Sequence, residues 1–138
     1  LGCHCWWLCV WHDDVLLLLL QACAEVLKAL KARLADSQSN LKPIAAAAIA
    51  DVLVSLEPTA LPKFFRLVGE PLLNATSDNK KVMRDAALAA VESILTLGNG
   101  PGQAAHPVVL EAMLPALASA LMHPVGRTEL LTCVAPYM

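Results

Sequence analysis

The sequence predicts an all-α fold, an α-solenoid built from about three helical hairpins. Of its 138 residues, 57% are hydrophobic and 16% are charged, so the chain must bury its Leu, Val and Ala side chains in packed structure. Aromatic residues make up only 4%, and this composition favours packed helices over a β-sandwich. One plan also recurs along the chain, in which two apolar helices flank a short polar break. That recurrence predicts repeated hairpins within one compact unit.

The first hairpin is predicted from helices at 15–35 and 41–56, separated by the polar break 36–40. Leu27, Leu30 and Leu34 recur at helical spacing and give the first helix an apolar stripe to bury. The second helix carries an alanine cluster at 45–48, which would let a neighbouring helix approach closely.

The second hairpin is predicted from helices at 60–75 and 81–97, separated by the break 77–80. Pro62 falls in the first turn of its helix, where a missing amide hydrogen costs nothing. Pro71 falls inside that helix and should bend it. In the helix that follows, alanines between 86 and 90 again predict close packing.

The third hairpin is predicted from helices at 107–122 and 127–138, separated by the break 123–126. Pro107 begins the first of these helices, and Pro115 lies inside it. Between hairpins, the stretches 56–59 and 97–102 contain the Pro and Gly residues that stop helices.

The repeat length identifies the type of hairpin. Asp36 and Asp78 are 42 residues apart, and Asp78 and His123 are 45 apart. HEAT and armadillo units are roughly 40 to 47 residues long, so the predicted hairpins are of HEAT type. Pro71, Asp78 and Arg84 also follow one another at close to the HEAT spacing. We therefore expect Asp78 to cap the helix at 81–97, and Arg84 to form an ion pair with Asp78 or Asp85.

The N-terminal residues 1–12 are set apart from the solenoid at 13–138 and are expected to be irregular. They contain three tryptophans and the thiols of Cys3, Cys5 and Cys9. Together with His4 and His12 these are zinc-ligand types, but no second pair follows at a known spacing, so we expect no metal and no cofactor. The odd total of five cysteines also argues against a disulfide framework.

Charge and hydropathy exclude several classes of protein. A formal charge of −2 excludes a globally basic nucleic-acid binder. The apolar runs 6–11 and 15–20 are separated by polar residues and are each too short to span a bilayer. Because no basic residue precedes Lys28, the N-terminus lacks the charged region of a signal peptide. These features predict a soluble intracellular protein without membrane or nucleic-acid partners.

No catalytic arrangement can be assembled from the sequence. It offers no pair of carboxylates and no nucleophile with a base at a useful spacing. The stretch 77–80 spells both S-x-x-K and S-D-N, but two overlapping motifs cannot build the penicillin-recognising site that uses them separately. The glycines at 98, 100 and 102 do not follow a strand, so a phosphate-binding loop is not expected. We therefore expect the chain not to be an enzyme.

Three segments resemble the turns and second helices of TOG domains, the tubulin-binding HEAT-repeat domains of microtubule polymerases and CLASP rescue factors. The segments are LKARLAD at 30–36, SDNKKVMRDAAL at 77–88 and GRTELL at 126–131. The resemblance covers about residues 25–134. Because TOG domains carry six repeats and about three are found here, it implies the C-terminal half of such a domain or a degenerate one. It also implies a cytoplasmic, cytoskeletal protein that binds αβ-tubulin at the microtubule plus end.

In that family, the loops inside the repeats form the edge that docks on tubulin. Carried over to this chain, the resemblance assigns to that edge Ser39, Asn40, Lys42, Asn79, Lys80, Lys81, Arg84 and Arg127. Two alternatives stay open: Lys80 and Lys81 are also ordinary residues for a solvated helix start, and Arg84 also suits a structural ion pair. The alternative function is a general HEAT scaffold for protein–protein interaction. Exposed repeat ends would also favour self-association.

Overall fold

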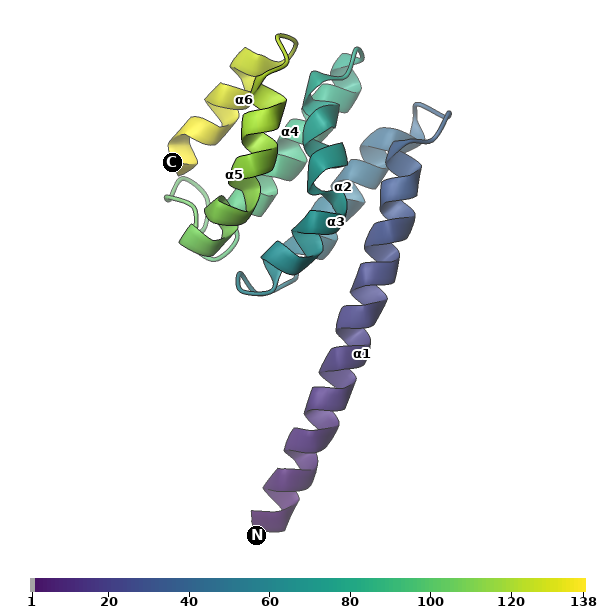
Figure 1. Ribbon diagram of the computed structural model, residues 1–138, viewed down its shortest axis with the longest axis vertical. Helices are drawn as coiled ribbons and strands as arrows, with labels where there is room; N and C mark the ends of the chain where they lie inside the picture. The colour runs from purple at the N-terminus through teal and green to yellow at the C-terminus, as the bar shows by residue number, and fades with distance from the viewer. Residues whose placement is uncertain (1) are drawn as a thin grey trace.

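The computed structural model describes the backbone of residues 2–138 and the side chains from Asp14 onward. Within these residues the fold is all-α, with six α-helices, two short 3₁₀ turns and no strand (Figure 1). The α-helices are α1 (Gly2–Leu34), α2 (Leu41–Val54), α3 (Leu61–Asn74), α4 (Lys81–Leu95), α5 (Pro107–Leu121) and α6 (Arg127–Val134). The 3₁₀ turns are η1 (Ala75–Ser77) after α3 and η2 (Ala135–Tyr137) after α6.

The predicted hairpins are confirmed, with helix boundaries close to those expected. Four of the helices, α2, α4, α5 and α6, begin at the predicted residues. The first helix differs, because α1 begins at Gly2 rather than near Val15. Residues 1–12, expected to be irregular, therefore fall almost entirely within the bounds of α1, and their side chains lie outside the described residues.

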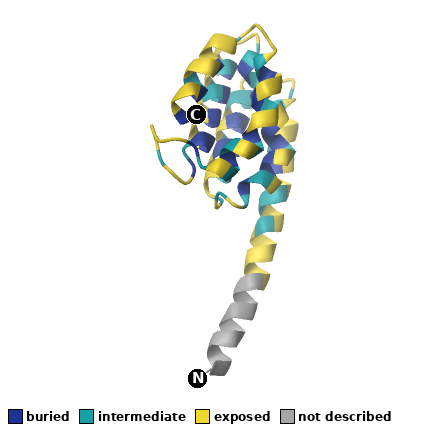
Figure 2. Ribbon diagram, turned by 60° about the vertical axis from the view of Figure 1, so that its left-hand side comes forward, coloured by how far each residue is buried: buried dark blue, intermediate teal, exposed yellow. Residues whose placement is uncertain are grey.

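The helices pack in two layers, as an α-solenoid requires. In one layer α3 lies between α1 and α5, and in the other α4 lies between α2 and α6. Each hairpin connects the layers through the contacts of α1 with α2, α3 with α4, and α5 with α6. Figure 2 shows the buried residues gathered between the layers and exposed residues outside them.

The core is filled by aliphatic side chains and by alanines where α2 meets α4. Ala46, Ala87 and Ala90 are buried there, so the predicted close approach of helices is confirmed. Phe64 and Ile49 are among the larger fully buried side chains. Small residues at a helix contact let the backbones approach, while large residues elsewhere fill the space that remains.

The helix starts follow local rules, with one addition. Pro62 and Pro107 lie at the first two positions of α3 and α5, as predicted, and Pro71 and Pro115 lie inside those helices. The addition is at His106, whose Nδ1 accepts a hydrogen bond of 3.2 Å from the N–H of Val108 and so caps α5. Because His is not among the favoured capping residues, this cap could not be predicted from the sequence.

The third hairpin is joined to the second by bonds that span many residues. The N–H of Ala105 donates to the carbonyl of Tyr137 at 2.8 Å, and the Tyr137 hydroxyl donates to Glu92 Oε1 at 3.2 Å. Burial, together with the Glu92 carboxylate, raises the pKa of Tyr137. These contacts connect α4, the linker before α5 and the final turn.

Candidate functional site

The loops inside the three hairpins lie together along one edge of the molecule, at the top of Figure 1. We call this the loop edge and define it as residues 35–40, 75–80 and 122–126 with the helix ends beside them. A cleft of about 280 Å³ joins the first two loops, since it is lined by Lys31 and Lys42 on one side and by Asn74 and Asp78 on the other. The second and third loops touch through Gly126, where an added methyl group would overlap the Thr76 carbonyl oxygen.

Aspartates shape the first two loops in the same way. The Asp36 carboxylate accepts from the N–H of Gln38 at 2.9 Å, and the Asp78 carboxylate accepts from the N–H of Lys80 at 2.9 Å. The prediction that Asp78 caps the next helix is therefore wrong: its carboxylate holds the turn, and Lys80 occupies the capping position of α4 without a side-chain bond. The hydrogen bond from the Gln38 N–H lowers the pKa of Asp36, and the Arg33 guanidinium at 3.0 Å lowers it further.

Arg84 is held by backbone carbonyls rather than by a carboxylate. Its Nη1 donates to the carbonyl of Asp78 at 2.8 Å and to the carbonyl of Asn79 at 3.1 Å. The predicted ion pair is wrong because both candidate carboxylates are engaged elsewhere, Asp78 with the Lys80 N–H and Asp85 with the Lys81 ammonium. The structural role expected of Arg84 is nevertheless present, because it ties the second loop to the helix that follows.

Arg127 repeats this arrangement in the third loop. Its Nε donates to the carbonyl of Leu121 at 2.7 Å, and its Nη2 donates to the carbonyl of Met122 at 3.0 Å. Those carbonyls end α5 and have no partner within the helix, so the cation also lies where the helix dipole favours positive charge. Lys42 holds the corresponding place in the first hairpin, 42 residues before Arg84, and is half-buried beside the cleft.

The two central lysines extend into solvent. Lys81 forms an ion pair with Asp85 at 2.8 Å, and its side chain is 78% exposed. Lys80 is exposed and has extended backbone just before α4. In the other predicted positions of the loop edge, Ser39, Asn40 and Asn79 are also exposed. The structure therefore brings the predicted residues to one edge but divides them into exposed lysines and amides and two backbone-bound arginines.

The sequence prediction missed Lys31 and Asn74, which also line the cleft of the loop edge. Lys31 is exposed in the last turn of α1, a position where a basic side chain suits the helix dipole. It lies within the segment 30–36 that suggested the family resemblance, so the signal was present but was assigned only to the turn.

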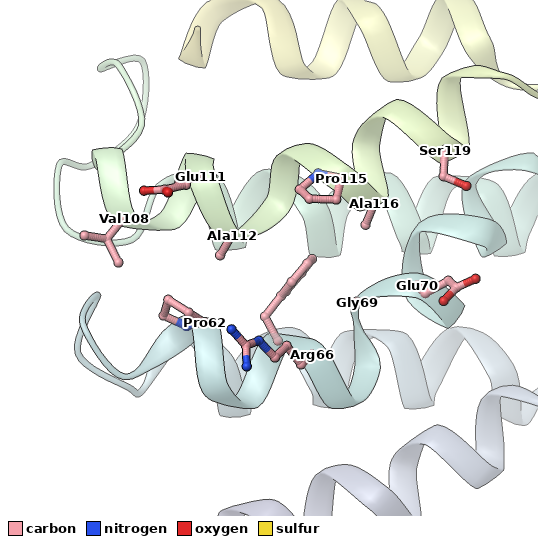
Figure 3. A pocket seen from close by; sticks show the side chains of 11 residues that line it. Pro62, Arg66, Gly69, Glu70, Val108, Glu111, Ala112, Pro115, Ala116 and Ser119 are labelled. Carbon is pink, nitrogen blue, oxygen red and sulfur yellow. The ribbon is translucent and has the colours of Figure 1, made fainter.

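A second concave surface lies between α3 and α5, a groove of about 680 Å³ shown in Figure 3. It exists because small residues face each other there, with Gly69 on α3 and Ala112 and Ala116 on α5. The Phe65 ring fills the space that a side chain at Gly69 would need. Carboxylates of Glu70 and Glu111 and the guanidinium of Arg66 also line the groove, and Gly69 in a helix interior was its only sequence signal. The other residues that line the groove are Pro62, Val108, Pro115 and Ser119.

Residues 14–138 contain no group of three or more His, Cys, Asp and Glu placed to hold a metal ion. The candidate zinc ligands among residues 3–12 lie outside that part. Burial, with a smaller effect of Glu92, raises the pKa of the Cys133 thiol, which makes it a poorer nucleophile at neutral pH. No helix within the described residues is long and apolar enough to cross a membrane.

Comparisons with protein-family models, with curated proteins and with solved structures found no match to this chain. The loop edge and the groove are the two surfaces that bear on its function. Of these, the loop edge is the one that gathers basic side chains from all three hairpins, and the groove is the one with an apolar lining.

Proposed function

We propose that this chain is a non-catalytic tubulin-binding module of a microtubule-dynamics regulator and corresponds to the C-terminal half of a TOG domain. The observation that carries the proposal is the convergence of three intra-hairpin loops on one edge that presents Lys31, Lys80 and Lys81 to solvent. The partner is αβ-tubulin or the microtubule plus end, in the cytoplasm. Any nucleotide chemistry belongs to tubulin, and the module itself needs no cofactor.

Electrostatics and preorganisation both support this function. The surface of tubulin is acidic, so lysines along one edge would steer its approach and favour one orientation of docking. Arg84 and Arg127 fix the backbone of two loops before any partner arrives. Less conformational entropy is then lost on binding, which leaves more of the contact energy as affinity.

The test reverses the charge of the two central lysines. Lys80→Glu with Lys81→Glu should weaken co-elution with soluble tubulin, and the loss should grow at low salt, where charge steering is least screened. The free energy of unfolding should change by no more than about 0.5 kcal/mol, because both side chains are exposed.

The matched control is Lys28→Glu with Lys63→Glu. It makes the same change in charge at exposed lysines away from the loops, and Lys28, like Lys81, is partnered by a carboxylate on its own helix, Glu25 at 3.5 Å. Tubulin binding should survive in this control. Unchanged binding in the Lys80 and Lys81 double variant, or an equal loss in both double variants, would remove the tubulin function from this edge.

The alternative function, a general HEAT scaffold, is favoured by one specific observation, the groove between α3 and α5. Its volume lies within the range of ligand-binding pockets, and its lining is mostly apolar with a few charged groups. Ala112→Phe should fill the groove without altering the loops. If this variant loses a partner that the Lys80 and Lys81 double variant retains, the scaffold function is the correct one.

A further inference from the structure

Helix α1 carries two apolar stripes on different faces. The inner stripe packs against α2 and α3 and is partly or fully buried; its members are Leu20, Cys23, Leu27, Leu30 and Leu34. Among these, Leu27 is fully buried. This face accounts for the attachment of α1 to the solenoid.

The outer stripe lies on exposed residues of the same helix and consists of Val15, Leu19, Ala22, Val26 and Ala29. Their spacings are four, three, four and three residues, the repeat by which a helix presents a continuous apolar seam to another helix. Val15 is 49% exposed, Leu19 58% and Val26 46%. No charged residue interrupts the outer stripe.

The geometry points to a second copy of this chain as the partner of the outer stripe, and we propose that two α1 helices pair in antiparallel orientation. A symmetric dimer needs a patch that is complementary to itself. With Ala22 at the twofold axis, Val15 of each copy faces Ala29 of the other, and Leu19 faces Val26. Large residues thus meet small or medium ones along the seam, as close helix packing requires.

The shape of the molecule leaves room for this pairing. Residues 14–19 are all exposed, and α1 extends beyond the other helices in Figure 1. The opposed orientation also sets the N-terminal end of each helix dipole beside the C-terminal end of the other.

The exposed apolar area is sufficient for a weak but specific dimer. Leu18 flanks the outer stripe and is 64% exposed. Covering Leu18 together with the stripe in two copies would bury at most on the order of 1,000 Å² in total, the lower bound for specific interfaces. Glu25, which lies beside the stripe, forms an ion pair with Lys28 and so brings no unpartnered charge to the seam.

Sedimentation analysis of the whole chain over a range of concentrations tests the proposal. The mass should rise from that of the 14.7 kDa monomer to twice that value. Leu19→Glu with Val26→Glu should shift dissociation to at least tenfold higher concentration without loss of helical circular dichroism. The control Ile44→Glu with Leu131→Glu changes exposed aliphatic residues on α2 and α6 and should leave the dimer intact.

Crosslinking tests the orientation. In a chain whose native cysteines are replaced by alanine, Val15→Cys mixed with Ala29→Cys should form a disulfide between copies, whereas Val15→Cys alone should not. A strict monomer at every concentration, or larger species that bind a lipid vesicle in place of a dimer, would overturn the proposal. Dimers that survive the Leu19 and Val26 double variant would do so as well. None of the residues in this proposal lies on the loop edge, so the dimer and the tubulin function are tested by different variants.

Discussion

Removing the Arg84 side chain should destabilise the solenoid although the residue forms no ion pair. Arg84→Ala deletes two charge-assisted hydrogen bonds to backbone carbonyls, at 2.8 Å to Asp78 and 3.1 Å to Asn79. The first of these bonds is partly buried and the second is exposed. An exposed carbonyl is readily solvated after the substitution, whereas a partly buried one is solvated only in part.

The size of the effect follows from that difference. A hydrogen bond to a charged group contributes about 1.5 to 3 kcal/mol when buried, and much less when water can replace the donor. We therefore expect a net loss of about 1 to 2 kcal/mol. For a domain of this size, such a loss lowers the melting temperature by roughly 3 to 8 °C.

Thermal melts and urea titrations of three variants check this reasoning. Lys81→Ala is the matched surface control, since its ion pair with Asp85 is exposed and should contribute less than about 0.5 kcal/mol. Arg84→Lys should lie between the control and Arg84→Ala, because an ammonium group can reach one carbonyl but lacks the planar fork. If Arg84→Ala and Lys81→Ala were equally stable, the carbonyl contacts would have no structural importance.

Three further predictions concern the Gly126 contact between loops and the hydrogen bonds of Asp36 and Tyr137. Gly126→Ala should cost about 3 kcal/mol or more in chemical denaturation, because φ is +75° and the methyl group would overlap the Thr76 carbonyl; a loss below about 1 kcal/mol would contradict the contact between loops. The folded pKa of Asp36 is lowered, so its contribution to stability is present above the ordinary Asp pKa near 3.9 and is lost as pH falls through the folded pKa. In a plot of the urea unfolding midpoint against pH, Asp36→Asn should therefore reduce the fall on the acid side. The folded pKa of Tyr137 is raised, so its contribution to stability persists up to the ordinary Tyr pKa near 10 and is lost as pH rises through the folded pKa. Tyr137→Phe should lower the urea midpoint at neutral pH, and the difference from the unaltered chain should shrink above about pH 10.

The fold could be predicted from sequence because its determinants are local. Apolar periodicity, Pro at helix starts and polar breaks depend on a few neighbouring residues, and they placed the hairpins almost to the residue. The start of α1 was misplaced because charged residues at 13–14 and the preceding Trp and Cys residues do not follow an amphipathic pattern, and the helix continues through them.

The site was predicted less completely because it depends on contacts between hairpins. The family resemblance assigned Lys80, Lys81 and Arg127 to one edge, but it did not predict the partners of Arg84. Spacing predicts which residues are near, while the choice between a carboxylate and a carbonyl depends on which acceptors are already engaged. Predicting the groove beside Phe65 would have required knowing how α3 packs on α5, and Gly69 was the one residue that pointed to that packing.

The distribution of the hydrogen bonds also has a consequence for how the chain folds. The hydrogen bonds from Arg84 and Arg127 to backbone carbonyls close loops of about six residues, whereas the bond from Tyr137 to Glu92 closes a loop of 45 residues. Chain statistics make the longer closure more costly by about 2 kcal/mol of entropy. We therefore expect each hairpin to form early and independently, and the third to dock on the second late, so that its amides exchange with solvent before those of α2 and α4.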